Sequence, residues 1–273
     1  MLISRDQPVL NNCYYKDIMP TYKHSGAAGD LAYGLALAKH FGPGDFLVHL
    51  NQMNWVGQHY YGALPEPFHR DRLNQSDFEW MRSLIGSQPY IKDCRILDPK
   101  TAEVTHNLDR FREVFVGHPG NYVDCYSAAF RIDDPELRRK IRQTPWIIAD
   151  PLVRNDGRDI AVNRTTRWLP PQLPEQWATW QPELEQRTFF VGLESEHVEF
   201  KRAVGWDIPY QPVGSMLELA QYIRGASRFI GNQSQALALA IGMGQDYWCE
   251  LRRDLPRDRN ECHFLDQPGS NYF

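Results

Sequence analysis

The sequence predicts an α/β protein with two domains, each built around a mostly parallel β-sheet. The chain has 273 residues, of which 42% are hydrophobic, enough for one large α/β domain or two small ones. Short apolar segments typical of buried strands alternate with helical segments, as a parallel sheet with helical crossovers requires. A polar Asn-Asp-Gly turn at 155–157 separates two such series. We therefore expect a boundary near 150–158, between an N-terminal domain of residues 1–154 and a C-terminal domain of residues 155–273.

The first half of the chain carries the signals of an α/β unit. A Gly-rich loop at 25–30 precedes a Leu- and Ala-rich helix over 31–41, and an apolar strand follows over 45–50. Farther along we predict a helix over 77–86 with Ser76 as its N-cap, a strand over 90–97, helical or mixed segments over 109–116 and 122–130, and a charged helix over 134–143.

The same alternation restarts after the Asn-Asp-Gly turn. Buried strands are predicted over 160–163, 188–192 and 229–231, and helices over 196–204, 216–225 and 234–243. Strands that alternate with helices in both halves indicate two Rossmann-like domains facing a cleft.

The composition argues against several classes of protein. The net charge is −4, so a large non-specific surface for nucleic acid is not expected. The sequence has no apolar run of 18 residues and no apolar N-terminal segment, so we expect a cytoplasmic protein that is neither exported nor membrane-spanning. The cysteine count is odd and no CxxC or zinc-type spacing occurs, which indicates free thiols in a reducing compartment. The five cysteines are Cys13, Cys94, Cys125, Cys249 and Cys262.

The segment 228–239 is the most informative motif. A short apolar strand runs into the turn Gly231-Asn232-Gln233-Ser234 and then into a small-residue helix. Such a turn directs backbone N–H groups and the positive end of a helix dipole at one place, which suits a phosphate. The motif indicates a protein that handles a nucleotide or nucleotide-sugar. Ser234 as a plain helix N-cap is the structural alternative, and it is compatible with that function.

The Gly-rich loop before the first helix is a second candidate. It follows His24 and contains Ser25, Gly26 and Gly29, and its glycines allow a tight turn and the close approach of a ligand. Asp30 follows at the start of the helix. There a carboxylate is either a partner for the helix dipole or a catalytic base facing a cleft, and on its own the structural reading is favoured. The loop matches neither GxGxxG nor a Walker P-loop.

Polar residues also follow the strands at 160–163 and 188–192. Asn163, Arg164 and Arg167 come at the carboxyl end of the first of these strands, where open α/β sheets bind ligands and where arginines can grip phosphate oxygens. The alternative is two solvated surface arginines. Glu194 follows the second strand and could bind ribose or sugar hydroxyls, whereas Glu196 and Glu199 are expected to cap the next helix.

Aromatic and histidine residues gather between positions 51 and 70. Trp55 and His59 belong to this segment, and such side chains can stack on a sugar ring or on a base. The alternative is a loop that folds onto its own domain.

Taken in order, these pieces resemble the GT-B glycosyltransferases, in particular the ADP-heptose:lipopolysaccharide heptosyltransferases and their short phage and bacterial relatives. The resemblance implies that Asp30 is the base facing the acceptor. It also implies that the turn formed by Gly231, Asn232 and Ser234 holds the donor diphosphate, and that Arg164, with Arg167 behind it, neutralises that diphosphate. The family has a histidine in the helix after the serine, where this chain has Leu237 and Ala238.

The resemblance implies a nucleotide-diphosphate sugar as co-substrate, with no cofactor and no metal. The acceptor stays open: a glycan or lipid-linked saccharide is one possibility, and the aromatic and His-rich segment 51–70 makes a hydroxylated base in DNA another. The sequence does not specify an oligomeric state. Two other classes stay open, a non-catalytic nucleotide- or sugar-binding module and another Rossmann-type enzyme such as a sugar-nucleotide epimerase. The absence of an early GxGxxG argues against the epimerase.

Overall fold

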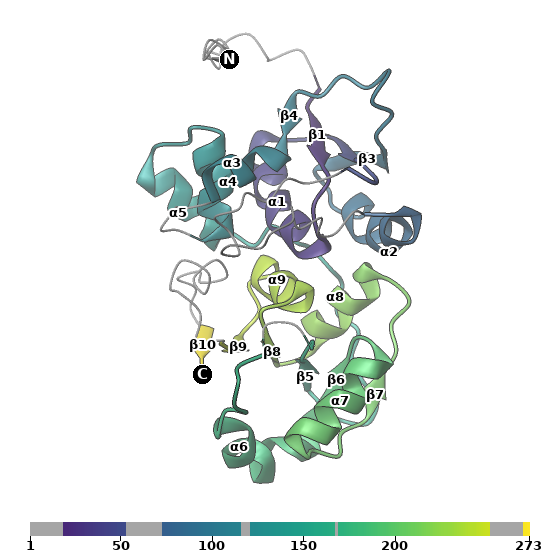
Figure 1. Cartoon of the computed structure of the whole chain (residues 1–273), viewed down its shortest axis with the longest axis vertical. Coiled ribbons are helices and arrows are strands. Elements are labelled where there is room, and N and C mark those ends of the chain that lie inside the picture. Colours follow the sequence, from purple (N-terminus) through teal and green to yellow (C-terminus); the bar gives the residue numbers. More distant parts are fainter. Residues whose placement is uncertain (1–18, 53–72, 116–120, 167–168, 252–269) are drawn as a thin grey trace, which may run out of the picture.

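The computed structural model describes residues 19–52, 73–115, 121–166, 169–251 and 270–273, and within them it contains two separate parallel sheets (Figure 1). The first sheet has the order β3-β2-β1-β4 and is made of β1 (Thr21–His24), β2 (Gly44–Val48), β3 (Ile91–Ile96) and β4 (His106–Asn107). The second has the order β10-β9-β8-β5-β6-β7 and is made of β5 (Ile160–Asn163), β6 (Thr188–Val191), β7 (Tyr210–Gln211), β8 (Arg228–Asn232), β9 (Tyr247–Glu250) and β10 (Ser270–Tyr272).

The strand pairings confirm the predicted fold class. Each described pairing is parallel, and β5 lies between β6 and β8 in the middle of the second sheet. Two Rossmann-like sheets, one from each half of the chain, are therefore present.

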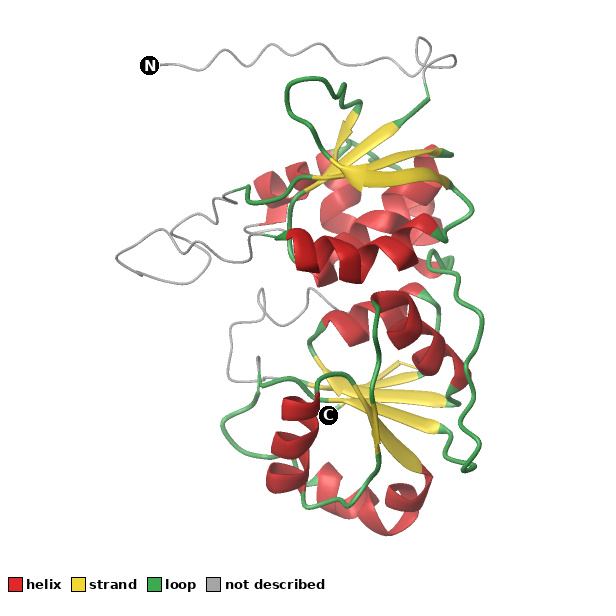
Figure 2. Cartoon of the chain, turned by 90° about the vertical axis from the view of Figure 1, so that its right-hand side faces the viewer, coloured by secondary structure: helices red, strands yellow, loops and turns green. Residues whose placement is uncertain are grey.

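The helices of the first half lie on the side of the first sheet that faces the second half (Figure 2). They are α1 (Ala28–Phe41), α2 (Gln75–Gly86), α3 (Phe111–Phe115), α4 (Tyr122–Ala129) and α5 (Pro135–Gln143), with a 3-10 turn at Leu108–Arg110. The predicted starts of α1 and α2 were wrong. Helix α1 begins at Ala28, which places Asp30 inside its first turn, and α2 is capped by Asn74 rather than Ser76 because Asn74 and Asp77 form a reciprocal capping box.

The second sheet has helices on both faces. Helices α8 (Met216–Gly225) and α9 (Gln235–Gly242) lie between the two sheets, while α6 (Gln176–Leu184) and α7 (Glu194–Val204) lie on the far side (Figures 1 and 2). Helix α7 begins two residues earlier than predicted, so Glu194 is its first residue.

The two halves share an apolar interface. Residues 31–38 of α1 and 236–242 of α9 are all buried, and one continuous cluster of apolar side chains includes both helices. Helices that are apolar all round bury every face, so α1 and α9 pack against each other as well as against their own sheets. A second apolar cluster, centred on Trp177, Phe190 and Trp206, fills the far side of the second sheet.

Candidate functional site

The two predicted parts of the site meet where α1 and α9 begin. A Cβ atom added to Gly29, in the first turn of α1, would lie 3.7 Å from Cα of Gln235, the first residue of α9. The loop before α1 follows the carboxyl end of β1, and the turn before α9 follows the carboxyl end of β8. Segments some 200 residues apart in the sequence therefore lie side by side, with Asp30 one residue away from the contact.

Asp109, which the sequence reading did not single out, organises the Gly-rich loop. Its carboxylate accepts hydrogen bonds from the backbone N–H of Ser25 at 3.0 Å and from the Ser25 hydroxyl at 2.6 Å. It also pairs with Lys23 and accepts a bond of 2.7 Å from Nη1 of Arg112. Burial opposes ionisation, but the neighbouring His24, Arg112 and Lys23 outweigh it and hold the pKa of Asp109 well below its usual range.

His24, the last residue of β1, is buried beside this loop. Its Nδ1 accepts a bond of 2.9 Å from the backbone N–H of Gly26, and its Nε2 lies 2.6 Å from the hydroxyl of Tyr126. Because the Tyr126 hydroxyl donates to the backbone oxygen of Asp30 at 2.8 Å, Nε2 of His24 is the atom that carries the proton. Burial lowers the pKa of His24 to about 3, so the ring is neutral at pH 7. His24 and Ser25 are both fully buried and support the loop from within.

Asp30 is the third residue of α1, and its carboxylate is partly exposed, at 24%. Its Oδ2 accepts a bond of 3.2 Å from Nη2 of Arg112. The glycine at position 26 is needed for this contact, since a Cβ there would lie 1.9 Å from Nη2 of Arg112 and 2.9 Å from Cε1 of His24. The guanidinium of Arg112, which lies across the loop, therefore occupies the space that a side chain at position 26 would need.

Asn163 joins three segments at the carboxyl edge of the second sheet. Its Nδ2 donates to the backbone oxygen of Val191 at 2.9 Å, and its Oδ1 accepts from the hydroxyl of Ser234 at 3.3 Å. Ser234 is also the N-cap of α9, as the structural alternative predicted, and accepts from the N–H of Leu237 at 3.4 Å. Gly192 has a φ of 142°, and a Cβ there would lie 2.4 Å from Nδ2 of Asn163. Asn163 therefore fixes the ends of β5 and β6 relative to the start of α9.

The turn before α9 is held by buried amides. The side chain of Asn232 is fully buried, accepts from the N–H of Thr165 at 3.0 Å and donates to the oxygen of Thr165 at 3.0 Å. Gly231 lies against β5, where an added Cβ would be 2.4 Å from the backbone oxygen of Asn163. Gln233 is buried as well. These residues shape the turn, and the backbone of the turn leads directly into the first turn of α9.

Arg164 lies inside the protein rather than at an open surface. It is 7% exposed, and its Nε and Nη2 donate to the two carboxylate oxygens of Glu250 at 2.6 and 2.8 Å. Glu250, at the end of β9, is fully buried and also accepts from Nε1 of Trp177 at 3.0 Å. The planar fork expected to grip a diphosphate is thus engaged by a carboxylate that the sequence reading did not identify.

Of the remaining predicted site residues, the structure describes Glu194. Glu194 is exposed at the start of α7, directly after Gly192. Trp55, His59 and Arg167 lie outside the described residues. Of the five cysteines, Cys94, Cys125 and Cys249 are free and buried, and the other two lie outside the described residues.

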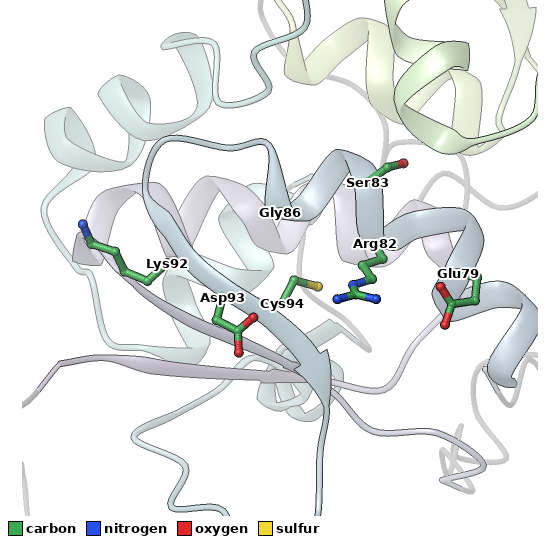
Figure 3. Close-up of a pocket in the computed structure, with 7 residues that line it drawn as sticks. All are labelled: Glu79, Arg82, Ser83, Gly86, Lys92, Asp93 and Cys94. Atoms are coloured by element: carbon green, nitrogen blue, oxygen red, sulfur yellow. The ribbon is translucent and has the colours of Figure 1, made fainter.

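A shallow pocket of about 400 Å³ lies elsewhere in the first half, between α2 and β3 (Figure 3). None of the predicted site residues lines it. The charges around it are mixed, with Glu79 and Asp93 beside Arg82 and Lys92. Burial raises the pKa of the Cys94 thiol to about 12, so this sulfur is protonated at neutral pH and is a poor nucleophile.

Within the described part of the chain, no group of three or more His, Cys, Asp or Glu side chains is arranged to hold a metal ion. No described helix has the length and apolar character to cross a membrane.

Comparison with known proteins supports the fold. No family model matches the sequence, and no curated protein matches it. Among solved structures, the chain is similar to a glycosyl transferase of family 9 from Veillonella parvula DSM 2008, with 11% identity, a TM-score of 0.53, and 93% of this chain and 86% of that chain covered. It is also similar to the E. coli ADP-heptose LPS heptosyltransferase II, with 10% identity, a TM-score of 0.52, and 94% of this chain and 90% of that chain covered. The chain therefore has the fold of these glycosyltransferases, GT-B, as the resemblance in its sequence predicted.

Proposed function

We propose that this chain is a glycosyltransferase that moves a sugar from a nucleoside-diphosphate donor to an acceptor hydroxyl, with Asp30 as the general base. The observation that carries the proposal is the contact between the first turns of α1 and α9, which sets a partly exposed carboxylate beside a helix N-terminus. The likeness in fold to two glycosyltransferases agrees with it.

The donor diphosphate is proposed to lie at the start of α9. The first N–H groups of a helix have no acceptor within the helix, and the helix dipole adds positive potential there. The hydroxyl of Ser234 accepts a hydrogen bond from one of these groups, the N–H of Leu237. The backbone of residues 231–233 leads from β8 to the same end of α9. The start of α1 adds a second positive helix end, and its N-cap residue, Ala27, has no side chain that caps it.

Arg164 has a smaller part in this proposal than the sequence implied. Glu250 neutralises its charge and occupies two of its N–H donors. In the proposed complex Arg164 therefore fixes the edge of the sheet, while the helix ends supply most of the positive potential that meets the phosphates.

The proposed reaction is a displacement at the anomeric carbon. The carboxylate of Asp30 takes the proton of the acceptor hydroxyl as that oxygen forms a bond to the anomeric carbon. The bond from the anomeric carbon to the diphosphate oxygen breaks, and its electron pair stays with the departing nucleoside diphosphate. The fixed dipoles at the start of α9 stabilise the charge that develops there.

A melting experiment with a panel of donors tests the proposal. The panel contains ADP-heptose, the ADP-linked sugar named for one structural neighbour, together with UDP- and GDP-sugars, CMP-sugars and NAD. A donor at 100 times its Kd should stabilise the protein by about 2.7 kcal/mol, a rise in Tm of about 5 °C or more. We expect such a rise with at least one nucleotide-diphosphate sugar, and we expect EDTA to leave it unchanged because helix ends replace a metal.

The same experiment separates the alternatives. A rise with NAD alone would favour another Rossmann-type enzyme and count against transfer. Binding without consumption of the donor, with glycans or hydroxylated DNA offered as acceptors, would identify a non-catalytic module. Absence of any rise across the panel would contradict the proposal.

A further inference from the structure

We propose that Arg112 is a positioning residue of the site: it holds the carboxylate of Asp30 in place and keeps it ionised, and Asp109 holds Arg112. This inference rests on the proposed function, since the role of Asp30 as a base belongs to that proposal. The contact geometry itself does not depend on it.

The guanidinium of Arg112 joins two carboxylates. Nη1 donates to Oδ1 of Asp109 at 2.7 Å, and Nη2 donates to Oδ2 of Asp30 at 3.2 Å. The group also lies 4.5 Å from the centre of the Phe111 ring, which stabilises it from one face. The Asp109 contact is the shorter of the two and its carboxylate is the more buried, with 10% against 24% exposed. Asp109 is therefore the anchor, and Asp30 is the group that Arg112 positions.

Asp109 is itself immobilised. Two hydrogen bonds from Ser25 and the ion pair with Lys23 join it to the end of β1 and to the residue that follows. Through Asp109, Arg112 is thus joined to the end of β1 and to the loop that leads into α1, the helix that carries Asp30. A second link runs through the interior, from His24 to the Tyr126 hydroxyl and on to the backbone oxygen of Asp30. The carboxylate and the backbone of Asp30 are held by separate contacts.

The charges around Asp30 give Arg112 its effect. His24 is neutral, and Tyr126 keeps its proton because burial raises its pKa well above the ordinary value. Lys23 is paired with Asp109, whose negative charge by itself would disfavour a second carboxylate nearby. Although burial disfavours its charged form, Asp30 and Asp109 raise the pKa of Arg112, so it stays a cation. Arg112 therefore brings a positive charge into direct contact with the Asp30 carboxylate.

Titration of the Asp30 carboxyl group tests the inference in the protein without ligands. The chemical shift of the Asp30 carboxyl carbon is followed by NMR against pH in wild-type protein and in Arg112→Gln. Removal of the cation should move the titration midpoint of Asp30 up by about one pH unit or more. Arg110→Gln is the matched control, because Arg110 lies two residues away and is exposed beside Glu113, and it should leave the midpoint unchanged.

A second variant keeps the test valid if Arg112→Gln does not fold. Gly26→Ala retains every charge but places a Cβ where Nη2 of Arg112 now lies, so it should move the midpoint in the same direction. Arg112→Lys retains the charge without the planar fork and should restore part of the wild-type midpoint. A midpoint that stays at the wild-type value in Gly26→Ala, or in a folded Arg112→Gln, would overturn the inference.

The enzymatic readout separates this inference from the proposed function. If transfer is detected, the acid limb of kcat/KM should move to higher pH in Arg112→Gln, because the base then loses its charge at a higher pH. A moved NMR midpoint in a protein that transfers no sugar would uphold the positioning contact and contradict the function. Transfer with an unmoved acid limb would uphold the function and contradict the positioning role.

Discussion

Replacing Glu250 with Gln is expected to lower the free energy of unfolding by about 3–5 kcal/mol, because the change leaves the charge of Arg164 buried without its counter-ion. Arg164 is 7% exposed and Glu250 is fully buried, so water cannot replace the lost partner. Trp177 also loses the ionised acceptor that its Nε1 uses. Unfolding in urea, followed by tryptophan fluorescence, measures the loss.

Two further variants show whether the ion pair is the cause. Removal of both charges in Arg164→Met with Glu250→Gln should cost much less than the sum of the single changes, since neither charge is then left unpaired. Asp159→Asn breaks another bidentate arginine pair, with Arg187, but that pair is about half exposed and the cost should be below about 1 kcal/mol. Equal losses at Asp159 and Glu250 would show that burial is not what matters.

Replacing Asp30 with Asn is expected to lower kcat for transfer by a factor of about 10² to 10⁴ and to leave donor affinity unchanged within about twofold. The amide has the size of the carboxylate and can still accept from Arg112, but it cannot take the acceptor proton. Steady-state kinetics combined with calorimetric titration of the donor separates the two effects. Turnover at the wild-type rate would remove Asp30 from the mechanism.

Helix α2 provides a control for the structural alternative, in which the Asp30 carboxylate serves only as a partner of the helix dipole. Asp30 and Asp77 are both the third residue of a helix, where a carboxylate favours the helix dipole. Asp77 has the ordinary structural role, since its side chain accepts from the backbone N–H of Asn74 at 2.8 Å. Asp77→Asn should therefore change stability slightly and leave transfer unaffected. A similar loss of transfer at both positions would indicate a general effect on helices.

The sequence predicts those parts of the fold whose signal is local. Strand β5 and helix α8 have the predicted bounds because each is a short apolar or amphipathic run with clear ends. Strand β1 was missed, since Lys23 interrupts its apolar pattern and is tolerated only because Asp109 pairs with it. Strand β9 is not predicted either, because its last residue is a buried glutamate that requires Arg164, the residue directly after β5.

The difference between local sequence patterns and contacts between distant segments applies to the site as well. The motifs at 24–30 and 231–234 were found because a glycine-containing turn between a strand and a helix is a local pattern. Asp109, Arg112 and Glu250 carry no such pattern. Each contacts a partner more than 80 residues away, which no local window of the sequence contains, although Arg112 also pairs with Asp109 three residues before it. Gly26 is an example: its sequence context predicts space for a ligand, but Arg112, a residue far away in the sequence, occupies that space.

The central claim is that a nucleoside diphosphate binds at the start of α9, and one pair of variants tests it most directly. Ser234→Asp keeps an effective N-cap but places a negative charge where the phosphates are expected. Ser215→Asp makes the same change at the N-cap of α8 and serves as its control.

Calorimetric titration of the nucleoside diphosphate that gives the largest rise in Tm is the decisive measurement. We predict binding weakened at least tenfold in Ser234→Asp, a loss of about 1.4 kcal/mol or more, with wild-type affinity in Ser215→Asp. Wild-type affinity in a folded Ser234→Asp protein would contradict the claim.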